Sequence, residues 1–135
     1  MTAVPPKLKV LVVDNERLIA DSLVLILKQN GCDATAAYSG EESVRLAAAL
    51  APDVLISDVI MGAMNGIAAA LTIRAAHPAC DILLVSGNHS TGALLEQARA
   101  AGHHFEALAK PVHPRWLLQR LGLSQTGMPL GPDPL

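Results

Sequence analysis

Short apolar runs alternate along the chain with longer segments of helical periodicity. Three runs, at 8–13, 53–57 and 82–85, consist almost entirely of apolar residues. Runs of this kind are typical of strands buried on both faces, as in a parallel sheet. Two weaker strand candidates lie at 33–37 and 106–109. The pattern therefore predicts five strands.

The segments between these runs carry apolar residues at helical spacing. The first segment has an apolar stripe at i, i+4, i+7 and i+8, formed by Ile19, Leu23, Ile26 and Leu27. Residues typical of helix ends mark all five segments. They are Asn30-Gly31 after the first helix, Ser39 with Glu42 before the second (44–50), Asn65 and His77-Pro78 around the third, Ser90 or Thr91 and Gly102 around the fourth, and His113-Pro114 before the fifth.

Five strands alternating with five helices predict an α/β domain with a parallel sheet. Right-handed crossovers then place helices on both faces, which makes the sheet doubly wound. We expect one domain over residues 7–122, preceded by an N-terminal extension at 1–6. Residues 123–135 are rich in glycine and proline, and we expect them to form a flexible tail.

Composition narrows the class of protein. Of the 135 residues, 51% are hydrophobic and only 2% aromatic, so the core must be built from Ala, Leu, Val and Ile. A net charge of -2 provides no broad basic surface for nucleic acid or anionic membranes. The chain has neither a signal-peptide pattern nor an apolar run of about 18 residues. We expect a cytoplasmic protein in which Cys32 and Cys80 are buried free thiols.

Polar residues follow the predicted strands at the points where they end. Asp14 and Asn15 follow the first run, Asp58 the third, Ser86 the fourth and Lys110 the fifth. In an open parallel sheet, ligands bind outside the carboxyl ends of the strands. We therefore expect these side chains to meet at one edge of the sheet.

This set of residues suits phosphoryl transfer. Clustered carboxylates persist most easily beside a hard divalent cation such as Mg²⁺, and a carboxylate held there can attack a phosphoryl group. A hydroxyl group and a lysine would stabilise charge on the phosphoryl oxygens. Taken singly, Asp14, Asp58 and Ser86 could each cap a helix or turn, and Lys110 could be a solvated surface charge. Their joint placement favours the functional interpretation.

The stretches VLVVDNERLIADSL, PDVLISDVIMGAMNG, ILLVSG and LAKPV resemble the response-regulator receiver family of two-component signalling, in the family's order and spacing. The resemblance covers about residues 7–121 and implies a flavodoxin-like sheet of order 2-1-3-4-5. It implies that Asp58 is the phosphoacceptor, that Ser86 and Lys110 assist it, and that the Lys110–Pro111 bond is cis. The implied ligands of Mg²⁺ (or Mn²⁺) are Asp14, Asn15, Asp58 and the backbone carbonyl of Ile60.

The resemblance also implies partners. A histidine kinase or phosphotransfer protein would supply the phosphoryl group, and the chain would promote only its own phosphorylation and dephosphorylation rather than act as a turnover enzyme. A separate protein would receive the signal at the face of the fourth helix, fifth strand and fifth helix, through which a homodimer could also form. Neither nucleic acid nor a membrane is an expected partner. Trp116 is either an exposed anchor of that face or partly buried along the helix edge.

Several positions depart from the family pattern. Asn15 stands where an aspartate is usual, which predicts weaker Mg²⁺ binding. Gly62 and Ala63 replace a proline and a frequent glycine, which predicts a looser loop after Asp58. Gly87 stands where alanine is common, which predicts room for the phosphoryl group and added mobility.

A further departure concerns the family's switch aromatic. Its position is occupied here by Ala107, and Phe105 is displaced from it by two residues, so that both would share one strand face. Rotation of an aromatic side chain is therefore not expected to carry the signal, and Phe105 is interpreted as a core residue.

Two other classes of protein share this fold. A pseudo-receiver, which binds partners without taking phosphate, is favoured by Asn15, Ala107 and the missing proline, but intact Asp58, Ser86 and Lys110 argue against it. A flavin-binding protein on the same fold would need a hydroxyl- and glycine-rich loop after the first strand, where this chain has DNER. The adjacent His103 and His104 would point to opposite faces of a strand and make a poor metal chelate.

Overall fold

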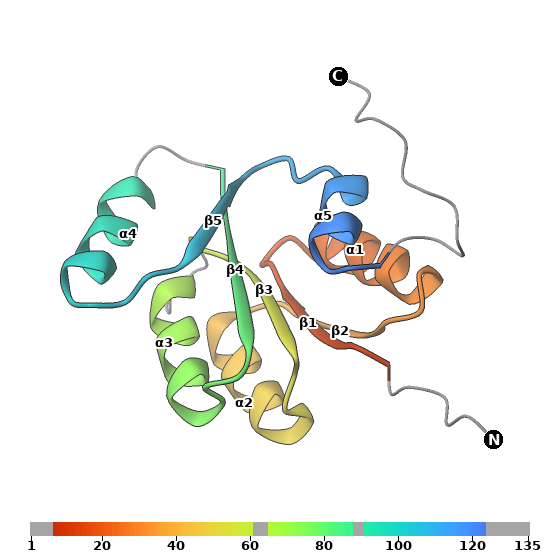
Figure 1. Cartoon of the computed structure of the whole chain (residues 1–135), viewed down its shortest axis with the longest axis horizontal. Coiled ribbons are helices and arrows are strands. Elements are labelled where there is room, and N and C mark those ends of the chain that lie inside the picture. Colours follow the sequence, from red (N-terminus) through yellow and green to blue (C-terminus); the bar gives the residue numbers. More distant parts are fainter. Residues whose placement is uncertain (1–6, 61–64, 88–90, 124–135) are drawn as a thin grey trace.

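The computed structural model describes residues 7–60, 65–87 and 91–123, in which five strands alternate with five helices (Figure 1). The strands are β1 (Lys9–Val13), β2 (Asp33–Ala37), β3 (Val54–Asp58), β4 (Asp81–Ser86) and β5 (Glu106–Ala109). The helices are α1 (Arg17–Gln29), α2 (Gly40–Leu50), α3 (Gly66–Ala76), α4 (Thr91–Ala100) and α5 (Pro114–Arg120). The predicted α/β class is confirmed.

The five strands form one parallel sheet of order β2-β1-β3-β4-β5, as the family resemblance implied. β2 and β5 have the predicted bounds, whereas the other strands differ by one residue at one or both ends. The difference matters at β3, because Asp58 is the last residue of the strand and does not follow it. β3 is buried along its whole length, which fixes the position of that aspartate.

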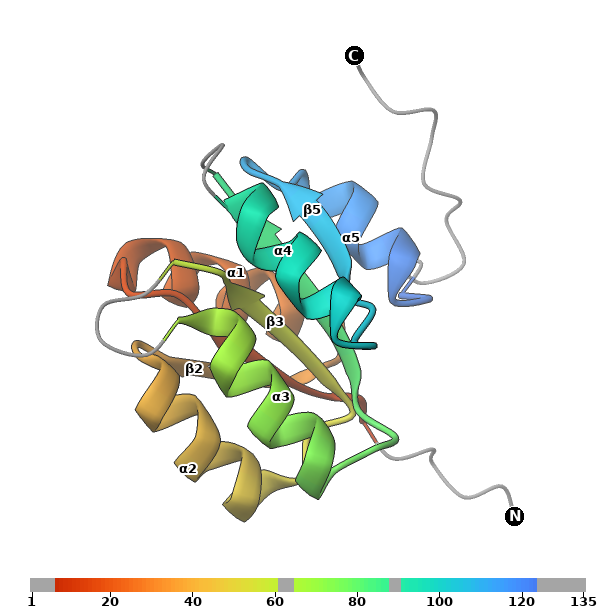
Figure 2. The same cartoon turned by 90° about the vertical axis from the view of Figure 1, so that its left-hand side faces the viewer.

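Helices cover both faces of the sheet, with α1 and α5 on one face and α2, α3 and α4 on the other (Figures 1 and 2). Alternate residues of each strand face opposite sides, so the sheet supplies two apolar clusters. Leu11 and Val13 pack with α2, α3 and α4, and Val10 and Val12 pack with α1 and α5. Among the described residues, no helix is both long enough and apolar enough to cross a membrane.

Side chains cap three of the helices at the predicted residues. Ser39 accepts a hydrogen bond from the Glu42 amide at 3.0 Å, and Asn65 accepts one from the Ala68 amide at 2.8 Å. His113 caps α5 by accepting a bond at Nδ1 from the backbone N–H two residues later. These bonds satisfy amide groups that have no partner within the helix.

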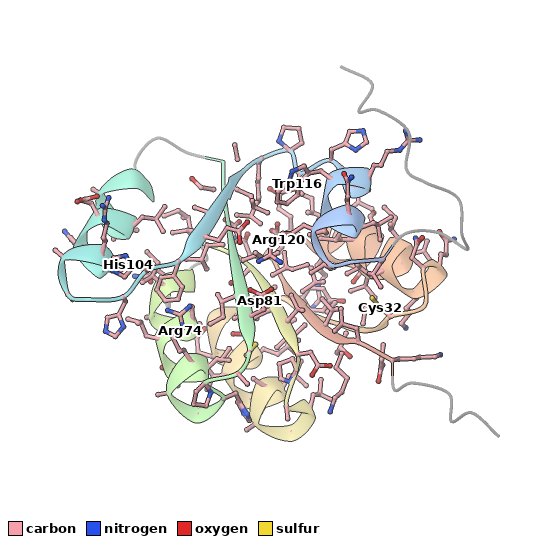
Figure 3. The ribbon with its side chains drawn as sticks, in the orientation of Figure 1. Cys32, Arg74, Asp81, His104, Trp116 and Arg120 are labelled. Atoms are coloured by element: carbon pink, nitrogen blue, oxygen red, sulfur yellow. The ribbon has the colours of Figure 1, made fainter. Side chains whose placement is uncertain are left out.

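An ionic cluster fastens α5 to the amino ends of two strands. The Arg120 guanidinium donates hydrogen bonds to Asp81 at 3.0 and 3.2 Å, and it also reaches Glu106, with a shortest distance of 2.7 Å. Figure 3 shows Arg120 directed from α5 toward Asp81 at the start of β4. The hydrogen bonds that Arg120 donates to Glu106 and Asp81 raise the pKa of its guanidinium, which favours the charged form.

The two cysteines are buried free thiols, as predicted. Burial raises the pKa of Cys80 to about 11, with the Asp81 and Asp53 carboxylates adding to the shift. Burial likewise raises the pKa of Cys32.

We expect both thiols to resist iodoacetamide at pH 8 in the native protein. With a pKa of about 11, only about one Cys80 thiol in a thousand is ionised at that pH, and the thiolate is the reactive form. Mass spectrometry should detect alkylation only after urea is added. Rapid modification of the folded chain would contradict the described burial.

Candidate functional site

The register of the parallel strands brings the predicted polar residues to one edge of the sheet. Val13 pairs with Ser57, so the residues that follow them, Asp14 and Asp58, lie side by side. Across the sheet, Ser86 pairs with Ala109, which places Lys110 one residue beyond β4. Three segments far apart in sequence therefore meet because their strands end at the same level.

Lys110 joins the two aspartates. Its Nζ donates one hydrogen bond to Asp14 Oδ2 and one to Asp58 Oδ2, each at 3.0 Å. Asp14 is only 4% exposed and Asp58 8%. The alternative of Lys110 as a solvated surface charge is therefore wrong. The alternative of Asp14 as a helix N-cap is also wrong, because Glu16 occupies that position in α1.

Electrostatics hold the lysine in its charged form. Burial lowers the pKa of Lys110, but the hydrogen bonds that it donates to Asp58 and Asp14 raise it, and the resulting pKa lies above the usual lysine value. The ammonium is thus protonated throughout the physiological range. It supplies one positive charge against two buried carboxylates, which leaves the cluster with a net charge of -1 if both are ionised.

The second oxygen of each carboxylate is held by the backbone. Asp14 Oδ1 accepts a hydrogen bond from the Glu16 amide at 2.9 Å, and Asp58 Oδ1 accepts a longer one from the Ile60 amide at 3.4 Å. Both bonds span two residues, so each carboxylate is oriented by the turn that follows its own strand. The orientation of the acids is therefore set locally, and Lys110 then connects them.

The composition of the cluster suits a hard divalent cation. It offers buried carboxylate oxygens and an excess of negative charge, which are the properties that Mg²⁺ requires. Asn15, a predicted ligand, is exposed beside Asp14, and Ile60 follows Asp58 by two residues. The described part of the chain contains no group of three or more His, Cys, Asp or Glu side chains suited to a metal, and this includes His103 and His104. Any metal here would need amide, carbonyl or water oxygens as well.

A family model described as the response regulator receiver domain matches residues 10–122. The chain belongs to the response regulator receiver family.

Solved structures agree with this assignment. A response regulator receiver protein from Pseudomonas putida is 30% identical, with a TM-score of 0.74, and the match covers 90% of this chain and all of that one. The chemotaxis protein CheY4 of Vibrio cholerae is 28% identical, with a TM-score of 0.76 and coverage of 87% and 98%. A receiver domain protein from Clostridium thermocellum is 27% identical, with a TM-score of 0.74 and coverage of 84% and 90%. This receiver therefore shares the fold and family of two-component signalling proteins.

Some of the loop residues named from the sequence belong to the described part of the receiver, and others do not. Gly62, Ala63 and Ser90 lie outside the described residues. Gly87 is described, and a Cβ atom there would come 3.1 Å from Cδ of Lys110. The absent side chain at 87 thus gives room to the stem of Lys110. The Lys110–Pro111 bond is cis, as the resemblance implied, and the Lys110 amide donates to the Ser86 carbonyl at 3.0 Å.

The predicted signalling residues of the receiver lie around β5. Ala107 is exposed, and Trp116 is half-buried against the cluster beneath α5. Both line a groove of about 330 Å³ that runs along residues 107–113. Phe105 precedes β5 and is half-buried beside the core, with the Arg74 guanidinium 4.2 Å from its ring centre. Arg74 also donates to the backbone carbonyl of His104, and Figure 3 labels this pair between α3 and the segment before β5.

Gly66 is a site residue that sequence reasoning missed. It is the first residue of α3, and a Cβ atom there would lie 1.9 Å from the carbonyl oxygen of Asp58. Its amide donates to the Val59 carbonyl at 2.7 Å. The absence of a side chain lets α3 start directly against β3. Asn65 indicated the start of a helix, but nothing in the sequence indicated this close approach.

We expect Gly66→Ala to destabilise the receiver by about 1–3 kcal/mol, because the added carbon must push α3 away from β3. Urea unfolding would measure the change. Gly92→Ala is the matched control, since that glycine lies in α4 with nothing within 4 Å of the added carbon. The control should be neutral or gain up to about 1 kcal/mol from helix propensity. Equal effects of the two substitutions would contradict the close approach.

Proposed function

We propose that this receiver accepts a phosphoryl group on Asp58 and thereby changes its interaction with a partner protein. One observation carries the proposal, namely that a single lysine ammonium lies 3.0 Å from each of two buried carboxylates at the carboxyl edge of the sheet. Residues 7–122 form the proposed receiver domain. The proposed phosphodonor is a histidine kinase or phosphotransfer protein, as is general for the family.

Each side chain of the cluster has a separate role in the proposed reaction. Asp58 is the nucleophile, because its carboxylate terminates a rigid buried strand and one of its oxygens is held only by a long 3.4 Å bond to an amide. Lys110 moves its ammonium from the carboxylate to the phosphoryl oxygens and neutralises charge there. Ser86 lies at the end of the adjacent strand, and its proposed role is to donate its hydroxyl to another phosphoryl oxygen. Asp14 keeps the lysine close during this exchange.

Mg²⁺ (or Mn²⁺) is the proposed cofactor. Its ligands from the chain would be Asp14, Asp58, Asn15 and the carbonyl of Ile60, which together supply only oxygen atoms. When bound, the metal would neutralise the negative charge of the cluster and of the incoming phosphoryl group. Asn15 adds an oxygen atom but no charge to this set.

The signal is proposed to leave through the groove beside β5. Lys110 is followed directly by residues 111–113, which connect it to α5 and Trp116. Any displacement of Lys110 toward a phosphoryl group pulls on this short connection. The groove formed by Ala107 and Trp116 would then change shape, which supports the face of α4, β5 and α5 as the site of a downstream partner or of a second copy of the chain.

A second candidate is a pseudo-receiver that binds partners independently of phosphorylation. The exposed amide Asn15 at a metal-ligand position favours it, because the cluster then has only two carboxylates for a divalent cation. The intact contact between Asp14, Lys110 and Asp58 favours the phosphorylated switch. The two candidates differ in one outcome, the covalent modification of Asp58.

We expect a gain of one phosphoryl group in intact mass after incubation with acetyl phosphate and Mg²⁺. The gain should be absent without the metal and in Asp58→Asn, because the nucleophile is then lost. Asp33→Asn is the matched control, since Asp33 is an exposed aspartate at the start of β2 and should leave the gain unchanged. No gain at any Mg²⁺ concentration would contradict the proposal and favour the pseudo-receiver.

We expect Asn15→Asp to tighten Mg²⁺ binding about fivefold or more, on the order of 1 kcal/mol, because a carboxylate replaces a neutral amide beside the metal. Titration calorimetry would measure both affinities. Gln29→Glu makes the same change of charge at the exposed end of α1 and should have little effect. Equal Mg²⁺ affinities in the parent and Asn15→Asp would refute Asn15 as a metal ligand.

We expect the fluorescence of Trp116, the only tryptophan, to change when beryllofluoride and Mg²⁺ occupy Asp58. The physical reason is the short connection from Lys110 to α5. Asp58→Asn should abolish the response. An emission spectrum that does not change, although binding at Asp58 is detected by mass or calorimetry, would show that the signal leaves by another route.

A further inference from the structure

An apolar pocket opens beside the phosphoacceptor. Its volume is about 600 Å³, within the range of small-molecule sites, and it lies between α1, the sheet and residues 110–114. The floor is formed by Val12, Ile56 and Val85, and the α1 wall includes Leu23 and Ile26. The chain has a single Phe, Trp and Tyr, none of which lines this space. Aliphatic side chains of modest size therefore leave it unfilled.

The pocket ends at the chemical groups of the receiver. Asp14, Asp58 and Lys110 all contribute to its lining. Strand alternation explains this, because Asp58 and Ile56 are two residues apart on β3 and face the same side of the sheet. Leu18 and Ile19, in the first turn of α1, also line the pocket and are 78% and 40% exposed. A ligand that reaches Lys110 thus has an apolar surface within reach at the mouth and another in the interior.

We propose that this pocket holds the acyl group of a small-molecule phosphodonor, an acyl phosphate with an apolar chain longer than acetyl. The proposal rests on the proposed function, since the phosphoryl group must reach Asp58. The choice of ligand follows from the complementarity of charge and polarity between the pocket and an acyl phosphate. The Lys110 ammonium attracts the phosphoryl dianion, and the aliphatic lining removes the acyl chain from water. An apolar amine would match the lining but would repel Lys110.

The transfer balances without another reactant. An Asp58 carboxylate oxygen forms a bond to phosphorus while the bond between phosphorus and the acyl oxygen breaks. The electron pair of the broken bond leaves with the acyl group as a carboxylate, and no proton changes place. In-line displacement puts the leaving oxygen on the side of phosphorus away from Asp58. The acyl chain therefore first meets Leu18 and Ile19 at the mouth, and it then turns inward along α1 toward Leu23.

The test compares the full chain's phosphorylation by acetyl, butyryl and hexanoyl phosphate in the presence of Mg²⁺, with phosphoramidate as a donor without an acyl group. The carboxylates that leave the three acyl phosphates differ little in basicity, so rate differences report binding of the chain. Burial of a methylene group is worth about 0.8 kcal/mol, and we expect the second-order rate constant to rise about two- to fourfold per methylene. Intact mass would follow the reaction.

Ser22→Phe is the variant that fills the pocket, since Ser22 is an exposed residue of α1 among the apolar lining residues. This variant should abolish the increase of the rate constant with acyl chain length and leave the rate constant with phosphoramidate unchanged. Gln29→Phe is the control, because Gln29 is exposed on the same helix and lies outside the pocket lining. It should keep the gain.

Binding of unreactive phosphonates gives an independent measure of whether the pocket holds an apolar chain. In the presence of Mg²⁺, hexylphosphonate should shift the NMR methyl signals of Ile19 and Ile26 at lower concentrations than methylphosphonate does, and Ser22→Phe should abolish the difference. Equal rates for all three acyl phosphates, with phosphoramidate active, would overturn this proposal alone and leave the pocket to an apolar side chain of a protein partner. Failure of every donor to modify Asp58 would overturn the proposed function as well.

Discussion

The structure depends on one shared cation. Asp14 and Asp58 are carboxylates at the ends of adjacent buried strands, and two such charges repel one another in a weakly polarisable environment. The Lys110 ammonium lies between them and donates to both, which makes their burial tolerable. The sheet register aligns the ends of the strands that carry these residues. Gly66 lets α3 start against the Asp58 carbonyl, and the absent side chain at Gly87 leaves room for the stem of Lys110.

Residues 110–114 connect the charged cluster, the apolar pocket and the groove of Trp116. Lys110 belongs to the charged cluster, Pro111 and Val112 line both the apolar pocket and the groove of Trp116, and Pro114 starts α5. At its other end α5 is fastened by Arg120 to Asp81 and Glu106. In the proposed switch, a change at Lys110 would therefore reach a helix that is held at its far end, and we expect the resulting movement near Trp116.

The fold and the centre of the site could be predicted from the sequence, whereas the spaces around them could not. Apolar runs and capping residues indicate the elements, and parallel strands bring their carboxyl ends together, so Asp14, Asp58 and Lys110 could be grouped in advance. The close approach of one element to another could not be predicted in this way, because it depends on how helices and strands pack in three dimensions. The contact of Gly66 with the Asp58 carbonyl and the pocket beside α1 have no local pattern in the chain, and the half-burial of Trp116 could not be decided from helical spacing alone.

The most direct test of the shared cation is an NMR titration of the Lys110 side chain in the metal-free protein. We expect its pKa to lie above the usual lysine value, to fall in Asp14→Asn and in Asp58→Asn, and to fall furthest when both are replaced, since only the effect of burial then remains. An ordinary lysine pKa in the parent, unaffected by either substitution, would contradict the account, because Lys110 would then not hold the two carboxylates together.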